Sequence, residues 1–501
     1  MTTTATEEPT AHTTSGDLRG ARENGASVFR GVPYAAAPVG ELRFAPPQAP
    51  PAWQGVRDAT CDGTIAPQGR SRLAHIMGDF ERPQSEDCLT LTVWTPALDA
   101  RKRPVMVWIH GGAYSSGAGS LPWYSGERFA ANGDVVFVSV SYRLGALGFL
   151  YLPGVSDGNL GLLDQVAALR FVRDNIAAFG GDPGNVTVVG QSAGAASIAF
   201  LMAMPAADGL FRRAIMQSTP FGRMTRTPDD AKRIGLRLLE VLGVKADEAT
   251  KLKSVPFHEF VTAQGQVARL EKKFADARAP FWPVIDGKII AGEVLPALKA
   301  GAGAAIDTMI GTTREEMAAF YCVDEDIAKA GPDAVDNVFA AIFPSGHQSH
   351  YDEARRMRAS SSNAALLGDL MTDAMFRIGS LRMAEWRADQ GRPAFVYQFD
   401  WQSPAGFESC HCIEMPFVFN NLGNWTDSPM LKGARPDEMQ GLAEAMHGAW
   451  IAFARTGKPD HSRLPVWPGY RREDRMTMRF DSVVGPVRDI AGLEWRLPWV
   501  R

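Results

Sequence analysis

The stretch Val188-Val189-Gly190-Gln191-Ser192-Ala193-Gly194-Ala195, "VVGQSAGA", places a serine between two glycines, directly after two β-branched residues. The segment 185–192 reads as a buried strand, and the small residues that follow suit the start of a helix. A strand that runs into Gly-x-Ser-x-Gly and then a helix holds the serine hydroxyl at the tip of a sharp turn. Side chains at Gly190 and Gly194 would collide with the neighbouring strand and helix, so we expect a strained backbone at Ser192.

The sequence around this turn alternates between short apolar runs and helical patterns, which predicts an α/β fold with a large, mostly parallel sheet. The N-terminal segment 16–35 differs, because its ENG turn predicts short antiparallel strands. The runs expected to be strands are 103–112, 133–143, 185–192, 308–316 and 392–401, and the segments expected to be helical are 162–185 and 439–459.

The composition of the chain favours a globular protein and disfavours nucleic-acid and membrane partners. The chain has 501 residues, a formal net charge of −4 and 45% hydrophobic residues, which is ordinary for a globular protein with a large core. No basic stripe is present, so nucleic acid is not an expected partner. Residues 1–15 are polar and are expected to form a disordered tail, with 16–501 as a single domain. No signal peptide or membrane span is apparent, which favours a cytoplasmic protein without a membrane partner.

The five cysteines are few and odd in number, so we expect free thiols rather than a disulfide framework. The run Cys410-His411-Cys412 lacks the usual spacing of metal ligands and has no second ligand pair nearby. We therefore expect no metal site.

A serine hydroxyl needs a base in contact with it to act as a nucleophile. In enzymes that hold a serine on such a strand–turn–helix, the base is a histidine that follows the acid in the sequence. His411 is favoured because it lies in a loop after the strand 392–401. The acid is expected after the strand near 310, where the residues alone leave Glu315 and Glu316 open. The other downstream histidines are His347 and His350 in a polar loop, His447 in a helical pattern and His461 in a proline-rich turn.

Several segments together resemble the type-B carboxylesterase/cholinesterase family. The resemblance covers nearly the whole chain beyond the polar tail and is strongest to the bacterial p-nitrobenzyl esterases. "GQS" at 190–192 and "CHCIEMPF" at 410–417 also resemble the aromatic-carbamate (phenmedipham) hydrolases of this family. The other matching segments are 29–44, 85–96, 107–120, 139–150 and 159–165, besides the serine turn itself.

The resemblance implies an α/β-hydrolase fold and a serine hydrolase without a cofactor. It selects Glu316 as the acid, although Met317 stands where the family usually has glycine, which keeps Glu315 as an alternative. Gly111 would allow close approach to the serine, and Ser218 would have a supporting role. The implied catalytic residues are Ser192, Glu316 and His411, and the implied oxyanion-hole donors are the amides of Gly112, Ala113 and Ala193.

The substrate is less well specified by these residues. Cholinesterases have a glutamate where Gln191 stands, so choline esters are disfavoured. Ala277 and Ala279 fall where those enzymes carry acyl-pocket aromatics, which suggests a roomier pocket. Phe281 and Trp282 are candidates either to line that pocket or to belong to the core. Since no strongly charged patch lies near the motifs, we expect a neutral, fairly bulky, small-molecule ester.

Two other functions remain open. The same residues could cleave carbamates or aryl amides. A non-catalytic scaffold protein is the remote alternative, and it is disfavoured because Ser192, Glu316 and His411 are all present.

In secreted relatives a bridge joins the cysteine at position 88 to an earlier loop. Alignment puts Ala66 rather than Cys61 at the partner position, so no bridge is expected. Oligomeric state is not predicted.

Overall fold

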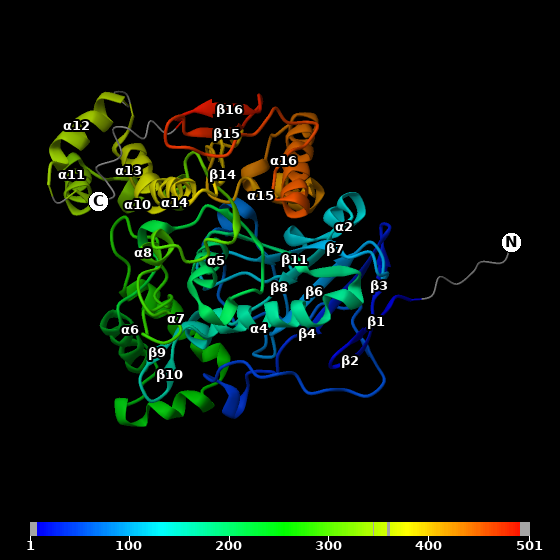
Figure 1. Ribbon diagram of the computed structural model, residues 1–501. Helices are drawn as coiled ribbons and strands as arrows, with labels where there is room; N and C mark the ends of the chain where they lie inside the picture. The colour runs from blue at the N-terminus through cyan, green and yellow to red at the C-terminus, as the bar shows by residue number, and fades with distance from the viewer. Residues whose placement is uncertain (1–7, 344, 358–360, 491–501) are drawn as a thin grey trace.

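An eleven-stranded sheet forms the centre of the protein in the computed structural model, which describes residues 8–343, 345–357 and 361–490 (Figure 1). Strands from residue 21 to residue 488 contribute to this one sheet. In order across the sheet, they are β16 (Gly485–Arg488), β15 (Met476–Phe480), β14 (Phe395–Phe399), β13 (Asp307–Thr313), β12 (Arg213–Gln217), β11 (Gly181–Gln191), β7 (Arg103–Ile109), β8 (Val136–Val140), β6 (Thr90–Thr95), β4 (Ala26–Pro33) and β3 (Ala21–Glu23).

The seven neighbouring strands from β15 to β8 are parallel, and antiparallel strands complete both edges. The predicted α/β class is therefore confirmed, and each of the five expected strand segments overlaps a strand of this sheet. The expected N-terminal hairpin is β3–β4. Its turn places Asn24 and Gly25 at φ values of 46° and 85°, which a two-residue hairpin turn of this kind requires.

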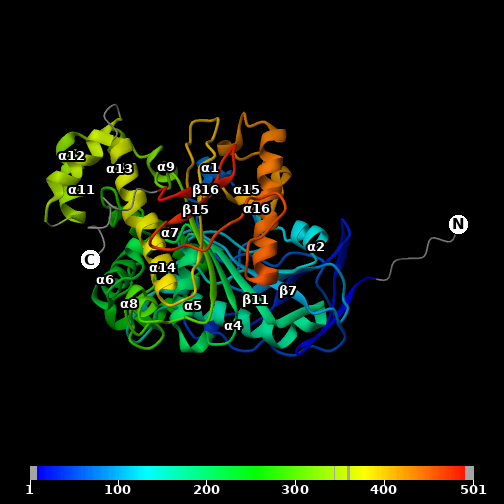
Figure 2. The ribbon, with the colours of Figure 1, turned by 45° about the horizontal axis from the view of Figure 1, so that its top comes forward.

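Helices cover both faces of the sheet, as Figures 1 and 2 show. Along β7, Val105, Val107 and Ile109 enter one core cluster, whereas Met106 and Trp108 enter the other. This alternation buries both faces, which a parallel sheet needs. Helices α4 (Leu160–Asn175), α5 (Ala193–Ala203) and α14 (Ile378–Asp389) pack on the first face, and α2 (Glu127–Gly133) and α16 (Pro436–Thr456) pack on the second.

The remaining helices lie around the sheet, and those from α10 to α13 form a lobe at one end of the molecule with its own apolar cluster (Figures 1 and 2). A π-helical turn at Asp373–Arg377 connects this lobe to α14. The helices not yet named are α1 (Ala74–Met77), α3 (Gly145–Phe149), α6 (Pro228–Val241), α7 (Phe257–Leu270), α8 (Val294–Lys299), α9 (Ala318–Tyr321), α10 (Glu325–Ala328), α11 (Pro332–Ile342), α12 (His347–Met357), α13 (Asn363–Thr372) and α15 (Met415–Phe419).

The expectation of a disordered tail over residues 1–15 is wrong for its second half. Strand β1 (Thr10–Thr13) pairs with β2 (Gly16–Arg19), which in turn pairs with β5 (Val56–Asp58). Ala11 and Leu18 are buried beneath this small sheet. The polar residues of this segment did not predict a strand, because its order comes from pairing with the neighbouring β2, which β5 extends into a small sheet. Residues 1–7 lie outside the described residues. A further two-stranded pair is β9 (Tyr151–Leu152) with β10 (Ser156–Asp157).

The order of the strands creates the place for a site. The chain passes from β7 to β8 on one side and then returns to β11 on the other side of β7. The loops that follow β7 and β11 therefore open beside each other at the carboxyl ends of parallel strands, where α/β sheets bind ligands.

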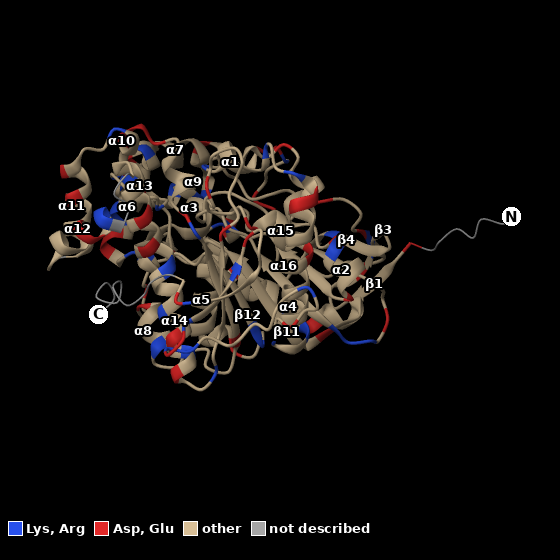
Figure 3. Cartoon of the chain, turned by 90° about the horizontal axis from the view of Figure 1, so that it is seen from above, with Lys and Arg blue, Asp and Glu red and all other residues tan. Residues whose placement is uncertain are grey.

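Charged residues of both signs are interspersed over the helices and loops, as Figure 3 shows. None of the helices in the described ranges is both long enough and apolar enough to cross a membrane.

Candidate active site

Ser192 lies at the tip of the turn between β11 and α5, with φ 56° and ψ −120°. A Cβ atom on Gly190 would lie 2.6 Å from the carbonyl carbon of Gly194, and one on Gly194 would lie 2.0 Å from the carbonyl oxygen of Ile109. The two glycines therefore permit the contact between this turn, its helix and β7, as the sequence predicts. The amide of Ser192 donates to the carbonyl of Gln217 at 2.8 Å, which ties the strained residue to β12.

His411 and Glu316 meet below this turn. Nδ1 of His411 lies 2.5 Å from Oε2 of Glu316, and both side chains are buried. The other carboxylate oxygen, Oε1, accepts from the amide of Thr313 at 2.8 Å, so the end of β13 orients the acid. A proton on Nδ1 that is donated to Glu316 leaves Nε2 with a free lone pair, which is the tautomer a general base needs.

Glu315 does not contact His411. Its carboxylate accepts from the amide of Ser409 at 3.2 Å and pairs with Arg314 at 2.8 Å, and its own amide donates to Ser409 at 3.0 Å. Burial raises the pKa of Glu315 to about 7, against the opposing effect of Arg314. The Glu315 side chain is therefore partly buried and bonded to its neighbours. It fastens the loop that carries His411.

The turn that carries Glu316 accommodates Met317 at the position where the family usually has glycine. Its backbone is right-handed, with φ −75° and ψ −11°, so no glycine is required. The side chain is fully buried and packs with Met371, Met375 and Phe376. Burial of such a side chain contributes about 1.5–3 kcal/mol. The amide of Met317 also donates to Thr372 Oγ1 at 3.1 Å, which anchors the turn to α13.

Gln191, the residue before the serine, contacts the free nitrogen of His411. Its Nε2 lies 3.1 Å from Nε2 of His411, and the side chain is buried. In the described part of the chain, Ser192 Oγ itself has no hydrogen-bond partner. Catalytic hydrogen bonds are often long or absent without substrate. Gln191 therefore contributes a neutral amide at the position where a glutamate would contribute a charge.

The loop after β7 presents backbone amides near the serine. Gly112, Ala113 and Tyr114 have φ values of 109°, 54° and 55°. Three successive positive φ values turn the backbone sharply at this point. Gln68 holds the far end of the loop, because its side chain bonds both the amide and the carbonyl of Gly117 at 2.6 and 2.9 Å. Among the hydrogen bonds of the described residues, none uses the amides of Gly112, Ala113 or Ala193. These three N–H groups remain available to a ligand.

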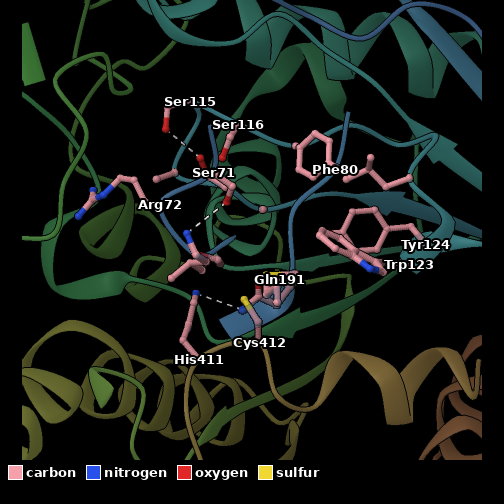
Figure 4. A pocket seen from close by; sticks show the side chains of 18 of the residues that line it. Ser71, Arg72, Phe80, Ser115, Ser116, Trp123, Tyr124, Gln191, His411 and Cys412 are labelled. Carbon is pink, nitrogen blue, oxygen red and sulfur yellow. Dashed lines mark hydrogen bonds between the residues drawn. The ribbon is translucent and has the colours of Figure 1, made fainter. Parts of the chain in front are cut away.

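A cavity that opens to solvent brings the predicted site residues together (Figure 4). Gly111, Gly112, Ala113, Gln191, Ser192 and His411 line it, with Glu316 and Ala193 buried behind. Further wall residues, from around α1, from the segment 121–124 and from α9, were not predicted from the sequence. The aromatic pair in "LPWYSG" at 121–126 was the available signal. The missed wall residues are Leu73, Met77, Phe80, Leu121, Trp123, Tyr124 and Phe320.

The residues expected to contact substrate are divided between this cavity and other places. Ala279 and Phe281 line a second cavity, which adjoins the first at Arg72 and Ser115. Trp282 belongs to the core, where its indole donates to the carbonyl of Met224 at 2.7 Å.

Ala277 and Ser218 line neither of the two cavities. The carbonyl of Ala277 accepts from Arg72 Nη1 at 2.6 Å. Ser218 is buried, and its hydroxyl has no hydrogen-bond partner among the residues that the structure describes.

The expectation that no charged patch lies near the site is wrong for the second cavity. Its cationic lining residues are Arg70, Arg72, Arg269, Lys272 and Arg278. They come from segments about 200 residues apart in the sequence, and only the fold shows that these residues line one cavity.

The remaining histidines lie elsewhere. His347 and His350 begin helix α12, which corrects the expectation of a loop, because the segment forms backbone hydrogen bonds from Gly346 onward. His447 is buried in α16, and its Nδ1 contacts the carbonyl of Val418 at 2.8 Å. His461 lies outside the helices, after α16.

The cysteines carry no disulfide in the structure, including Cys61, which is exposed, and Cys88, which is buried. Burial raises the pKa of Cys410 and Cys412 well above the ordinary thiol value, so both stay protonated. Across the described ranges, no three His, Cys, Asp or Glu side chains gather as metal ligands would.

Glu414 is a second buried carboxyl beside the His411–Glu316 pair. Its Oε1 accepts from Gln217 Nε2 at 3.2 Å, while Oε2 is buried without a hydrogen-bond partner in the described structure. Burial, and then the neighbouring Glu316 carboxylate, raise the pKa of Glu414 to about 7, although His411 opposes the shift.

The sequence model of the carboxylesterase family matches residues 7–489 of this chain. The chain belongs to the carboxylesterase family. It is 42% identical to the phenmedipham hydrolase of Pseudarthrobacter oxydans, over 96% of this chain and 97% of that protein. It is 39% identical to the para-nitrobenzyl esterase of Bacillus subtilis (strain 168), over 94% of both proteins.

Solved structures of carboxylesterases share the fold. The carboxylesterase EST55 of Geobacillus stearothermophilus at pH 6.2 superimposes with a TM-score of 0.87 and is 38% identical, over 98% of this chain and 99% of that chain. A PNB esterase superimposes with a TM-score of 0.85 at 37% identity, over 98% and 100% of the two chains. The chain is thus a carboxylic-ester hydrolase with the α/β-hydrolase fold.

The two adjacent glutamates give a matched pair of variants. Glu316→Gln is expected to lower kcat by about 10⁴-fold, because an amide no longer holds the required tautomer of His411. Glu315→Gln retains its place in the loop and is expected to cost no more than about tenfold. Steady-state hydrolysis of a p-nitrophenyl ester measures both, with circular dichroism as the check on folding. An inactive Glu315→Gln beside a near-normal Glu316→Gln would move the acid to position 315.

The raised pKa of Glu414 predicts a pH dependence of stability. The folded state keeps this proton up to about pH 7, whereas the unfolded state loses it near the ordinary value of 4.5. The stabilising contribution is therefore present at low pH and is lost as pH rises through 7, with a slope of up to about 1.4 kcal/mol per pH unit.

Glu414→Gln mimics the protonated form. The melting temperature of the variant minus that of the wild type should therefore increase between about pH 5 and pH 8, the range that the two pKa values set. Glu240→Gln, at an exposed position on α6, is the control and should show no such trend. Parallel melting curves for wild type and Glu414→Gln across this range would contradict the assignment.

Proposed function

We propose that the chain hydrolyses bulky carboxylic esters through an acyl-enzyme on Ser192, with His411 as general base and Glu316 as the acid that orients it. The observation that carries this proposal is the contact between His411 Nδ1 and Glu316 Oε2, in the same cavity wall as the strained Ser192. A nucleophile, a base and an orienting carboxylate on three separate loops are the constellation that acyl transfer needs.

In the first half of the reaction, Ser192 Oγ replaces the Gln191 amide at Nε2 of His411. Oγ then attacks the ester carbonyl carbon as its proton passes to Nε2. The carbonyl oxygen becomes an oxyanion, which accepts from the amides of Gly112, Ala113 and Ala193. Loss of one such donor typically costs about 10²–10³-fold in rate. The intermediate collapses, the C–O bond to the alcohol breaks, and Nε2 returns its proton to the departing alkoxide.

In the second half, water attacks the acyl carbon. Nε2 of His411 takes a proton from this water and passes it to Ser192 Oγ as the acid product leaves. Glu316 remains ionised and stabilises the imidazolium in both halves. Every bond change involves only the ester, water and these side chains, so the proposed cycle needs no cofactor.

The residues that line the cavity also indicate which kind of ester fits. The walls next to Ser192 include Met77, Leu121 and Tyr124, which suit an apolar group. Gln191 places no charge beside the nucleophile, which disfavours choline esters. The adjoining second cavity, which opens to solvent, leaves room for a long or branched substrate.

A second candidate function is hydrolysis of aryl carbamates, because the phenmedipham hydrolase is 42% identical over nearly the whole chain. The same residues would carbamoylate Ser192 in place of acylating it. Whether the chain prefers an ester, a carbamate or an anilide depends on the electrophile and the leaving group, which one comparative assay resolves.

The test is a panel of p-nitrophenyl esters, a phenylcarbamate and an anilide, assayed with wild type, Ser192→Ala and His411→Ala. Both variants are expected to lose at least about 10⁴-fold in kcat on every compound that the wild type cleaves. His447→Ala is the matched control, since this histidine is buried in α16 away from the cavity, and it should keep its rate even if it loses stability. A Ser192→Ala protein with most of the wild-type turnover would refute the mechanism.

A further inference from the structure

The second cavity is an outer chamber that continues the catalytic one. It is lined by the segment 68–72, by α7 and by the segment 276–281. Arg72 and Ser115 line both cavities, so a substrate bound at Ser192 can extend into the outer chamber. Figure 4 shows the Arg72 side chain turned away from His411 and Cys412.

The outer chamber carries an excess of positive charge. Five cations line it, against the two carboxylates of Asp276 and Asp324. The carboxylates are already engaged. Asp324 lies 3.3 Å from Lys272, and Asp276 lies 3.1 Å from Arg278 and 2.5 Å from Arg223, which stands outside the lining.

Two of the five cations have no carboxylate partner. Arg70 pairs with Asp79 at 2.6 Å. Arg72 and Arg269, by contrast, have no carboxylate within 4 Å among the described residues. In a chamber walled by protein, such charges are less screened than on an open surface and attract anions.

Arg72 is held in position for such an anion. Its Nη1 donates to the carbonyl of Ala277 at 2.6 Å, which leaves the other N–H groups of the guanidinium unused. The side chain is exposed to the chamber yet recessed in its wall, and this surrounding protein lowers its pKa. An arginine stays charged even so, and its planar fork matches the two oxygens of a carboxylate.

We propose that Arg72 binds a free carboxylate at the far end of the substrate's acyl part, so that the substrate class is a monoester of a dicarboxylic acid. The acyl side is indicated because Ala279 and Phe281, from the segment that the resemblance assigns to the acyl pocket, line the same chamber. The ester end would remain among the apolar walls next to Ser192. This inference rests on the proposed acyl-enzyme mechanism.

The test compares two matched series of substrates. One is the mono-4-nitrophenyl esters of linear dicarboxylic acids from adipic to sebacic acid, and the other is the same compounds with the far carboxylate capped as a methyl ester. The readout is the ratio of kcat/KM for the anionic and the capped ester at each chain length. The wild type should show the largest ratio at one favoured length, and raising the salt concentration should lower it.

Arg72→Gln is expected to lower this ratio at least tenfold at the favoured length, mainly through KM of the anionic ester, and Arg72→Lys should restore part of it. Arg173→Gln is the control, because this arginine pairs with Asp174 on α4 outside both cavities, and it should leave the ratio unchanged.

A ratio that Arg72→Gln does not change at any chain length would overturn the inference, as would an equal loss on both series. If the wild type cleaved neither series, the proposed ester hydrolysis itself would be at fault. Cleavage of the capped series alone would instead refute the carboxylate site.

Discussion

The contact on which the site depends is the close approach of Gly194 to the carbonyl of Ile109. A Cβ atom at position 194 would lie 2.0 Å from that oxygen, so any side chain would push α5 away from β7. Because the contact is allowed, the chain can reverse within a few residues and hold Ser192 at φ 56° above the sheet. The strain of this conformation, of order 1–3 kcal/mol, is offset by the packing of α5 against β11, β12 and β7.

The rest of the site follows from where parallel strands end. Loops after β7, β11 and β13, together with the loop beyond β14, all open at one edge of the sheet. They bring together free backbone amides, a hydroxyl, a carboxylate and an imidazole from positions 112 to 411. Contacts outside the cavity hold these groups in position. Glu315 ties the acid turn to the histidine loop through Ser409, and Met317 anchors it in an apolar cluster.

Much of this arrangement could be predicted from the sequence, because its signals are local. The five residues from Gly190 to Gly194 are enough to predict a sharp turn at Ser192, and the strands appear as short apolar runs. The choice between Glu315 and Glu316 is different, since two adjacent glutamates are equivalent until the fold decides which one points at His411. Strand β1 was not predicted, because the polar residues 10–13 do not indicate its pairing with β2 or the pairing of β2 with β5. The basic residues of the outer chamber come from two segments about 200 residues apart, and only the fold shows that they line one cavity.

The central claim is that Ser192 is the nucleophile, and covalent capture tests it most directly. The wild-type chain is treated with a fluorophosphonate, which phosphonylates an activated serine, and the adduct is located by peptide mass mapping. We expect one adduct per chain, on the peptide that contains Ser192, and none in Ser192→Ala. An adduct on a different residue, or equal labelling of Ser192→Ala, would contradict it.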